Sequence, residues 1–136
     1  MSDEKLNIEP KKLQATSYKL VSYKDLIVWQ KSMRLVVEIY KLTEKMPREE
    51  VYGLTSQMRR SAISIPSNIA EGRRRGGKNE YRHFLTIAYG SGAELETQVE
   101  LLKQLPFGSK LGYNIVDGLL SEVMRMINKM LSGLKS

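Results

Sequence analysis

The feature that most constrains the fold is a helical spacing of apolar residues in four separate stretches of the chain. Apolar side chains recur at steps of three and four residues in segments 24–46, 54–72, 78–105 and 116–134. This spacing places them on one face of an α-helix. Pro47, the pair Gly76 and Gly77, and the turn that begins at Pro106 separate the segments, so the connections are short. The pattern predicts an all-α fold, an antiparallel up-down-up-down four-helix bundle.

The chain has 136 residues, which fits a single domain. Residues 1–22 show no sustained periodicity and contain Pro10. Short polar runs of this kind do not supply enough apolar surface for a packed core. We therefore predict a mobile N-terminal arm at 1–22 and a four-helix bundle domain at 23–136.

The first helical segment carries two apolar rows, which lie about 140° apart at about 100° per residue. We assign the first row to the core of the subunit; it comprises Leu26, Trp29, Met33, Val36 and Tyr40. The second row exceeds what one packing face needs, and we predict that it forms an oligomer interface with Ile63 of the second segment. That row comprises Val28, Leu35, Ile39 and Leu42. The alternative is a helix at the centre of its own bundle.

Residues suited to catalysis or metal binding are few. The chain has no cysteine and one histidine, His83, without the spacing of a zinc or di-iron motif. The carboxylates Glu94, Glu96 and Glu100 have the pattern of a solvated helix face. We expect no enzymatic activity, metal or cofactor. Without a long apolar run or the apolar core of a signal peptide, we also expect a soluble, cytoplasmic protein without membrane contact.

Positive charge is concentrated around the second and third segments. The chain has a formal net charge of +7. The cluster after the second segment comprises Arg73, Arg74, Arg75, Lys78 and Arg82, and Arg59 and Arg60 precede it. A helix C-terminus favours the first three cations, but a helix N-terminus disfavours the last two, so a further reason for the charge is needed. We predict that these seven side chains bind the phosphates of a nucleic acid. The alternative is a solvated charged corner.

A polar row lies between the apolar rows of the second segment. It comprises Gln57, Arg60, Ser64, Asn68 and Glu71. A row of this kind fits a subunit interface, the lining of a channel or an exposed surface, and all three interpretations stay open.

Three stretches resemble a known family. They are YKDLIVWQKSMRLVVEIYKLTEKMP at 23–47, YGLTSQMRRSAISIPSNIAEGRRR at 52–75 and EYRHFLTIAYGSGAELETQ at 80–98. They are similar to the four-helix-bundle family encoded in intervening sequences of bacterial 23S rRNA genes. The resemblance implies a ring, a homopentamer, with no known catalytic activity. A similar bundle, in the accessory variability determinant protein of diversity-generating retroelements, is a basic pentamer associated with nucleic acid and a reverse transcriptase.

These observations lead to two hypotheses about function. The first is a nonenzymatic, oligomeric helical scaffold that binds RNA or DNA through the basic corner between the second and third helices. The second is a protein-protein interaction module with no role in nucleic-acid binding. The resemblance favours the first, because a ring multiplies a modest basic surface and so raises its avidity.

Overall fold

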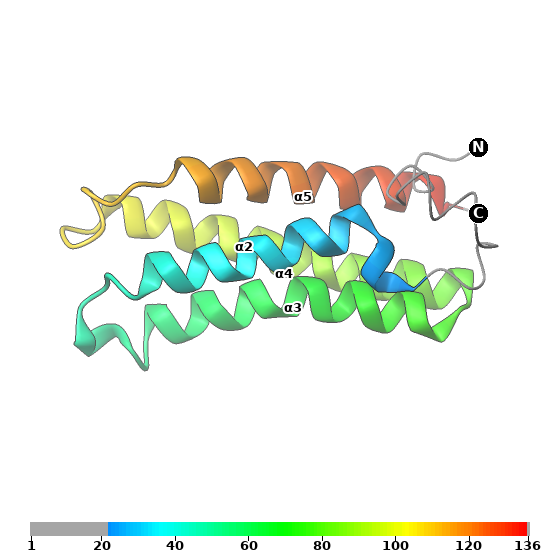
Figure 1. Cartoon of the computed structure of the whole chain (residues 1–136), viewed down its shortest axis with the longest axis horizontal. Coiled ribbons are helices and arrows are strands. Elements are labelled where there is room, and N and C mark those ends of the chain that lie inside the picture. Colours follow the sequence, from blue (N-terminus) through cyan, green and yellow to red (C-terminus); the bar gives the residue numbers. More distant parts are fainter. Residues whose placement is uncertain (1–21, 136) are drawn as a thin grey trace.

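A computed structural model describes residues 22–135, and this part of the chain is helical. It contains the α-helices α2 (Ile27–Thr43), α3 (Leu54–Arg75), α4 (Lys78–Gln104) and α5 (Asn114–Gly133), with short 3-10 helices η3 (Tyr23–Asp25) and η4 (Arg48–Glu50). The four long helices lie side by side (Figure 1). The predicted all-α fold is confirmed for these residues. The arm predicted at 1–22 lies outside the described residues, except for Ser22.

Helix α3 continues one turn beyond the end predicted at Gly72 and stops at Arg75. Gly76 follows with φ of 81°, the left-handed conformation that ends many helices. Gly72 is buried inside the helix, where a Cβ atom would lie 2.8 Å from Cβ of Phe84 on α4. The glycine at 72 therefore lets α3 and α4 approach closely and does not mark a helix end.

The predicted subunit interface is wrong for four of its five residues, and these four all lie on α2. Val28, Leu35, Ile39 and Leu42 are each at most 4% exposed within a single chain, so they form its core. The position of α2 between its neighbours explains the difference. Lys31, on one side of this row, pairs with Glu122 of α5. Thr43, on the other side, accepts a hydrogen bond from Arg59 of α3. The buried row therefore faces the space between α3 and α5, as the alternative of a central helix had proposed.

The first row of α2 is correspondingly more exposed than predicted. Only Leu26 of that row is fully buried, while Trp29, Val36 and Tyr40 are half-buried and Met33 is exposed. The fifth predicted interface residue, Ile63, is also exposed. The rest of the core comes from α3, α4 and α5 and includes Met58, Ile65, Ile69, Leu85, Leu95, Leu102, Val123, Ile127 and Met130. None of the helices within residues 22–135 has both the length and the hydrophobicity that a membrane span requires.

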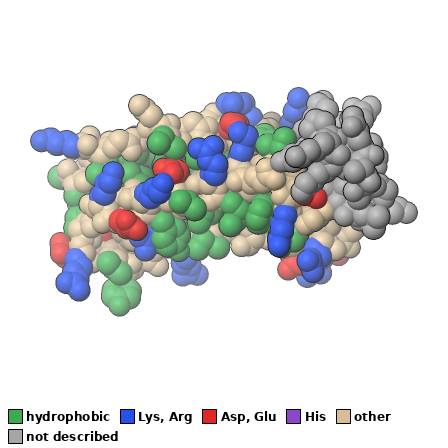
Figure 2. All heavy atoms as spheres, in the orientation of Figure 1, with side chains coloured by type: hydrophobic (Ala, Val, Ile, Leu, Met, Phe, Trp, Pro, Cys, Tyr) green, Lys and Arg blue, Asp and Glu red, His purple; other side chains and the backbone are tan. Residues whose placement is uncertain are grey.

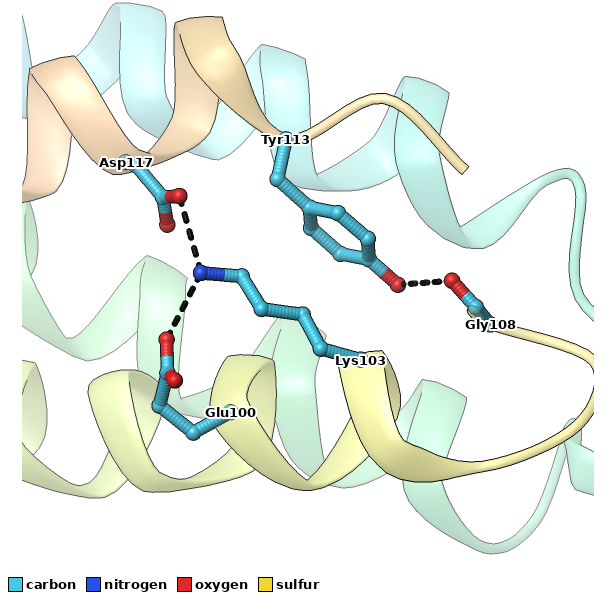
Figure 3. Close-up of polar contacts among 5 residues, drawn as sticks. All are labelled: Glu100, Lys103, Gly108, Tyr113 and Asp117. Carbon is cyan, nitrogen blue, oxygen red and sulfur yellow. Dashed lines mark hydrogen bonds and ion pairs between the residues drawn. The ribbon is translucent and has the colours of Figure 1, made fainter. Parts of the chain in front are cut away.

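A polar cluster joins the end of α4 to the start of α5 (Figure 3). Lys103 Nζ donates to Asp117 Oδ2 at 2.8 Å and to Glu100 Oε2 at 2.7 Å. The hydrogen bonds to Asp117 and Glu100 raise the pKa of Lys103 above its ordinary value. Tyr113 donates from its hydroxyl to the carbonyl oxygen of Gly108 at 2.6 Å, and burial raises its pKa. The cluster thus fixes the loop between the two helices.

Candidate functional site

Five basic side chains meet where α3 turns into α4. Arg73, Arg74 and Arg75 form the last turn of α3, while Lys78 and Arg82 belong to the first two turns of α4. We call these five residues the basic corner. Only two glycines separate the helices, so the side chains lie at one end of the bundle (Figure 1). Two carboxylates, Glu71 and Glu80, also lie in this region and leave a formal charge of +3.

The cations of the basic corner differ in how far other side chains engage them. Arg75 is paired with both carboxylates: its Nε lies 3.4 Å from Oε2 of Glu71, and its Nη1 lies 3.8 Å from Oε2 of Glu80. Its guanidinium also lies 5.1 Å from the ring centre of Phe84. Both ion pairs are about half exposed, and exposed pairs of this kind contribute about 0.2–1 kcal/mol. A phosphate can therefore compete for Arg75 at small cost.

Arg74 and Lys78 are exposed, as is the ion-paired Arg75. The Arg74 guanidinium lies 5.8 Å from the ring centre of Tyr23. Arg73 and Arg82 are half-buried, and Arg82 Nη2 lies 3.5 Å from Oδ1 of Asn79. The charge that the corner presents to solvent is thus carried mainly by Arg74 and Lys78.

Arg59 and Arg60, predicted to support the corner, lie elsewhere. Arg59 Nε donates to Oγ1 of Thr43 at 2.9 Å, and its guanidinium stacks over the ring of Tyr40 at 4.3 Å. It therefore joins α3 to α2. Arg60 is exposed, but it precedes Arg73 by about 20 Å along the same uninterrupted helix, at about 1.5 Å per residue. Neither residue belongs to the basic corner.

A polar groove runs between α3 and α4, with a volume of about 320 Å³. Its lining comprises Gln57, Arg60, Ser61, Ser64, Ser91, Glu94 and Gln98. The Ser64 and Ser91 hydroxyl oxygens are hydrogen-bonded at 2.7 Å. Asn68 Nδ2 donates to the carbonyl oxygen of Ser64 at 2.8 Å and to its hydroxyl at 3.0 Å. The polar row of the sequence therefore divides: its first three members line the groove, Asn68 supports its floor, and Glu71 pairs with Arg75.

The α3 half of this groove could be read from the sequence, but the α4 half could not. Ser91 and Gln98 share a helical row with apolar residues, a position typical of core residues, and Glu94 has the pattern of a solvated helix face. What brings them together is the close approach of α3 and α4. Within residues 22–135, no group of three or more carboxylate, histidine or cysteine side chains is arranged to hold a metal ion.

An apolar face lies on α2 and α3. Two contacts set its limits: Arg59 meets Tyr40 near the end of α2, and Arg74 meets Tyr23 just before α2 begins. The most exposed apolar side chains between these limits are Met33 at 40%, Val37 at 51% and Ile63 at 42%. Figure 2, which has the orientation of Figure 1, shows hydrophobic side chains over the middle of α2 and α3. We call Met33, Val37 and Ile63 the apolar face.

Comparison with known proteins adds one positive finding. A family model described as 23S rRNA-intervening sequence protein matches residues 24–129. This range includes the basic corner, the polar groove and the apolar face. No curated protein matches the chain.

Proposed function

Because the chain belongs to the 23S rRNA-intervening sequence protein family, we propose that it is a nonenzymatic, oligomeric scaffold that binds RNA or DNA phosphates in the bacterial cytoplasm. The observation that carries the proposal is the basic corner, where five cations from two helices lie around the connection between α3 and α4. An antiparallel up-down-up-down subunit is part of the proposal. Contacts between the end of one helix and the start of the next, such as Lys103 with Asp117, support it.

The chemistry of the corner suits a phosphate backbone. Arginine presents its N–H groups in a planar fork that matches phosphate oxygens, and lysine supplies a compact charge. Exposed Arg74 and Lys78 can reach a ligand directly. Contacts of this kind give affinity that falls steeply with salt and depends little on sequence.

The test is the salt dependence of binding. Fluorescence anisotropy with a labelled RNA hairpin and with duplex DNA would be measured between about 50 and 200 mM salt. The double variant Arg74→Gln with Lys78→Gln removes two exposed charges from the corner. Each phosphate contact contributes about 0.9 to the slope of log K against log salt for duplex DNA, so a loss of up to about 1.8 is expected.

A matched control removes the same charge from the opposite end of the bundle. Lys45 and Arg48 are exposed near the connection between α2 and α3, far from the corner (Figure 1). The double variant Lys45→Gln with Arg48→Gln should keep the wild-type slope. If both double variants lower the slope by the same amount, net charge, and not the corner, drives binding.

The oligomer in this proposal, a homopentameric ring as the family resemblance implies, uses the apolar face. Exposed apolar patches are rare on monomers unless they bind a partner, and this face lies between two aromatic-arginine contacts. Val37→Asp with Ile63→Asp should lower the mass measured by light scattering. Ile115→Asp is the control, because Ile115 is an exposed apolar residue of α5. An unchanged mass for the double variant would contradict this assignment.

The exposed apolar face also favours a second candidate function, a protein-protein interaction module without a role in nucleic-acid binding. In that case the wild-type protein would bind neither hairpin nor duplex at low salt. The corner variants would then have no effect, whereas the apolar-face variants would abolish binding to the protein partner. The two candidates therefore differ in which surface is sensitive to substitution.

A further inference from the structure

The polar groove has a hydrogen-bonded floor and one unsatisfied acceptor in its α4 wall. The Ser64, Ser91 and Asn68 side chains hydrogen-bond among themselves at its base. In the α4 wall, the side-chain oxygen Oε1 of Gln98 is buried and has no hydrogen-bond partner among the described residues. A buried acceptor without a donor lowers stability, so a ligand that donates to it gains free energy.

The two walls of the groove differ in hydrogen-bonding character. The α3 wall presents the Arg60 guanidinium, which only donates, and the α4 wall presents the Glu94 carboxylate, which only accepts. No ion pair joins Arg60 to Glu94 within the part of the chain that the structure describes. Both charged groups therefore remain available to a ligand lying between the helices.

A ligand that satisfies both walls needs adjacent donors on one side and acceptors on the other. Packed helices lie about 8–10 Å apart, so long side chains from both can reach one planar group above the floor. Guanine has this arrangement, with acceptors at O6 and N7 and donors at N1 and the N2 amino group. Its two adjacent donors match the two oxygens of Glu94, with Gln98 Oε1 as a further acceptor, and its acceptors match Arg60.

We infer that the polar groove binds an unpaired guanine base of the nucleic acid held by the basic corner, an inference that rests on the proposed function. The groove lies on α3, the helix that leads to the corner about 20 Å away, so one strand can span both. Its lining contains no aromatic side chain. The base is therefore recognised by its edge, as bases in RNA loops are, and stacking contributes little.

Three RNA hairpins that differ at one loop position provide the test. The position carries guanine, inosine or adenine; inosine lacks only the N2 amino group. With the wild-type protein, anisotropy should give about tenfold tighter binding of the guanine hairpin than of the inosine hairpin, and adenine should bind no better than inosine.

Two variants locate this preference in the groove. Glu94→Gln and Gln98→Met should each reduce the ratio of guanine to inosine affinity toward one, while the salt slope set by the corner stays unchanged. Glu96→Gln is the control, because Glu96 is exposed on α4 but does not line the groove. Circular dichroism would confirm that each variant is folded.

The outcomes separate this inference from the proposed function. Equal affinity for the three hairpins, with a salt slope that still depends on Arg74 and Lys78, overturns the guanine site and leaves the phosphate-binding function intact. A preference that survives both groove variants overturns the location of the site. Failure of every hairpin and of duplex DNA to bind at low salt overturns both proposals.

Discussion

The replacement of Gly72 by alanine tests whether close contact between α3 and α4 builds the basic corner. Gly72 is buried one residue before the three arginines. An added Cβ atom would lie 2.8 Å from Cβ of Phe84 and 3.1 Å from Cδ1 of Tyr81. Cβ of Phe84 is attached directly to the backbone, so the clash cannot be relieved by a rotamer change. The helices must move apart at the point where the corner begins.

Two opposing terms set the size of the effect. Alanine favours the helix over glycine by about 1 kcal/mol. Overpacking a close contact costs about 1–3 kcal/mol, and contact with a backbone-attached atom places this site in the upper part of that range. We expect Gly72→Ala to reduce the free energy of unfolding by about 1–2 kcal/mol, the difference between these terms.

Gly90→Ala is the matched control. Gly90 also lies inside a helix, α4, but a Cβ atom there meets nothing within 4 Å. Only the propensity term then applies, so this variant should be more stable than the wild type by about 0.5–1 kcal/mol. Urea unfolding at one protein concentration, followed by circular dichroism, would measure both changes.

The opposite signs of the two substitutions are the decisive result. Gly72→Ala should also weaken binding to the RNA hairpin, because it displaces Arg73, Arg74 and Arg75 relative to Lys78. If Gly72→Ala stabilises the protein as much as Gly90→Ala does, the contact between α3 and Phe84 is not tight, and the reasoning is refuted.

Three further predictions concern the core, the α2 to α3 contact and pH. Leu35→Ala should reduce the free energy of unfolding by about 2–5 kcal/mol, because Leu35 is fully buried. If light scattering instead shows that the variant dissociates into stably folded subunits, the original assignment of Leu35 to the subunit interface is supported. Arg59→Gln should lower the thermal midpoint but leave the salt slope of RNA binding unchanged, because Arg59 contacts α2; a reduced slope would place it in the binding site. The pKa of Lys103 is raised in the folded state, so its contribution to stability is present below about pH 10.4 and is lost as pH rises through the higher folded value. Lys103→Met should therefore flatten the decline in unfolding free energy at alkaline pH, and an unchanged pH profile would contradict this.

Much of the fold follows from the sequence because helix formation is local. The steps of three and four residues identify the four helices, and Pro47, Gly76 and Gly77 mark where they are interrupted. The basic corner is equally local, since its five residues lie in one short stretch that includes the turn. The end of α3 was misplaced because Gly72, read as a helix end, serves a contact with α4 that a single helix cannot reveal.

The sequence alone determined which residues form helices and where positive charge collects, because backbone hydrogen bonding and the order of residues fix both. Only the tertiary structure decided which side of each helix is buried. Two rows of α2 are about equally apolar, and the row that faces the core is the one turned toward both α3 and α5. The positions of Arg59 and Arg60 and the placement of Gln98 and Glu94 opposite the α3 wall of the groove have the same origin. The rotation of a helix about its axis depends on its neighbours, and the apolar periodicity of a single helix does not determine it.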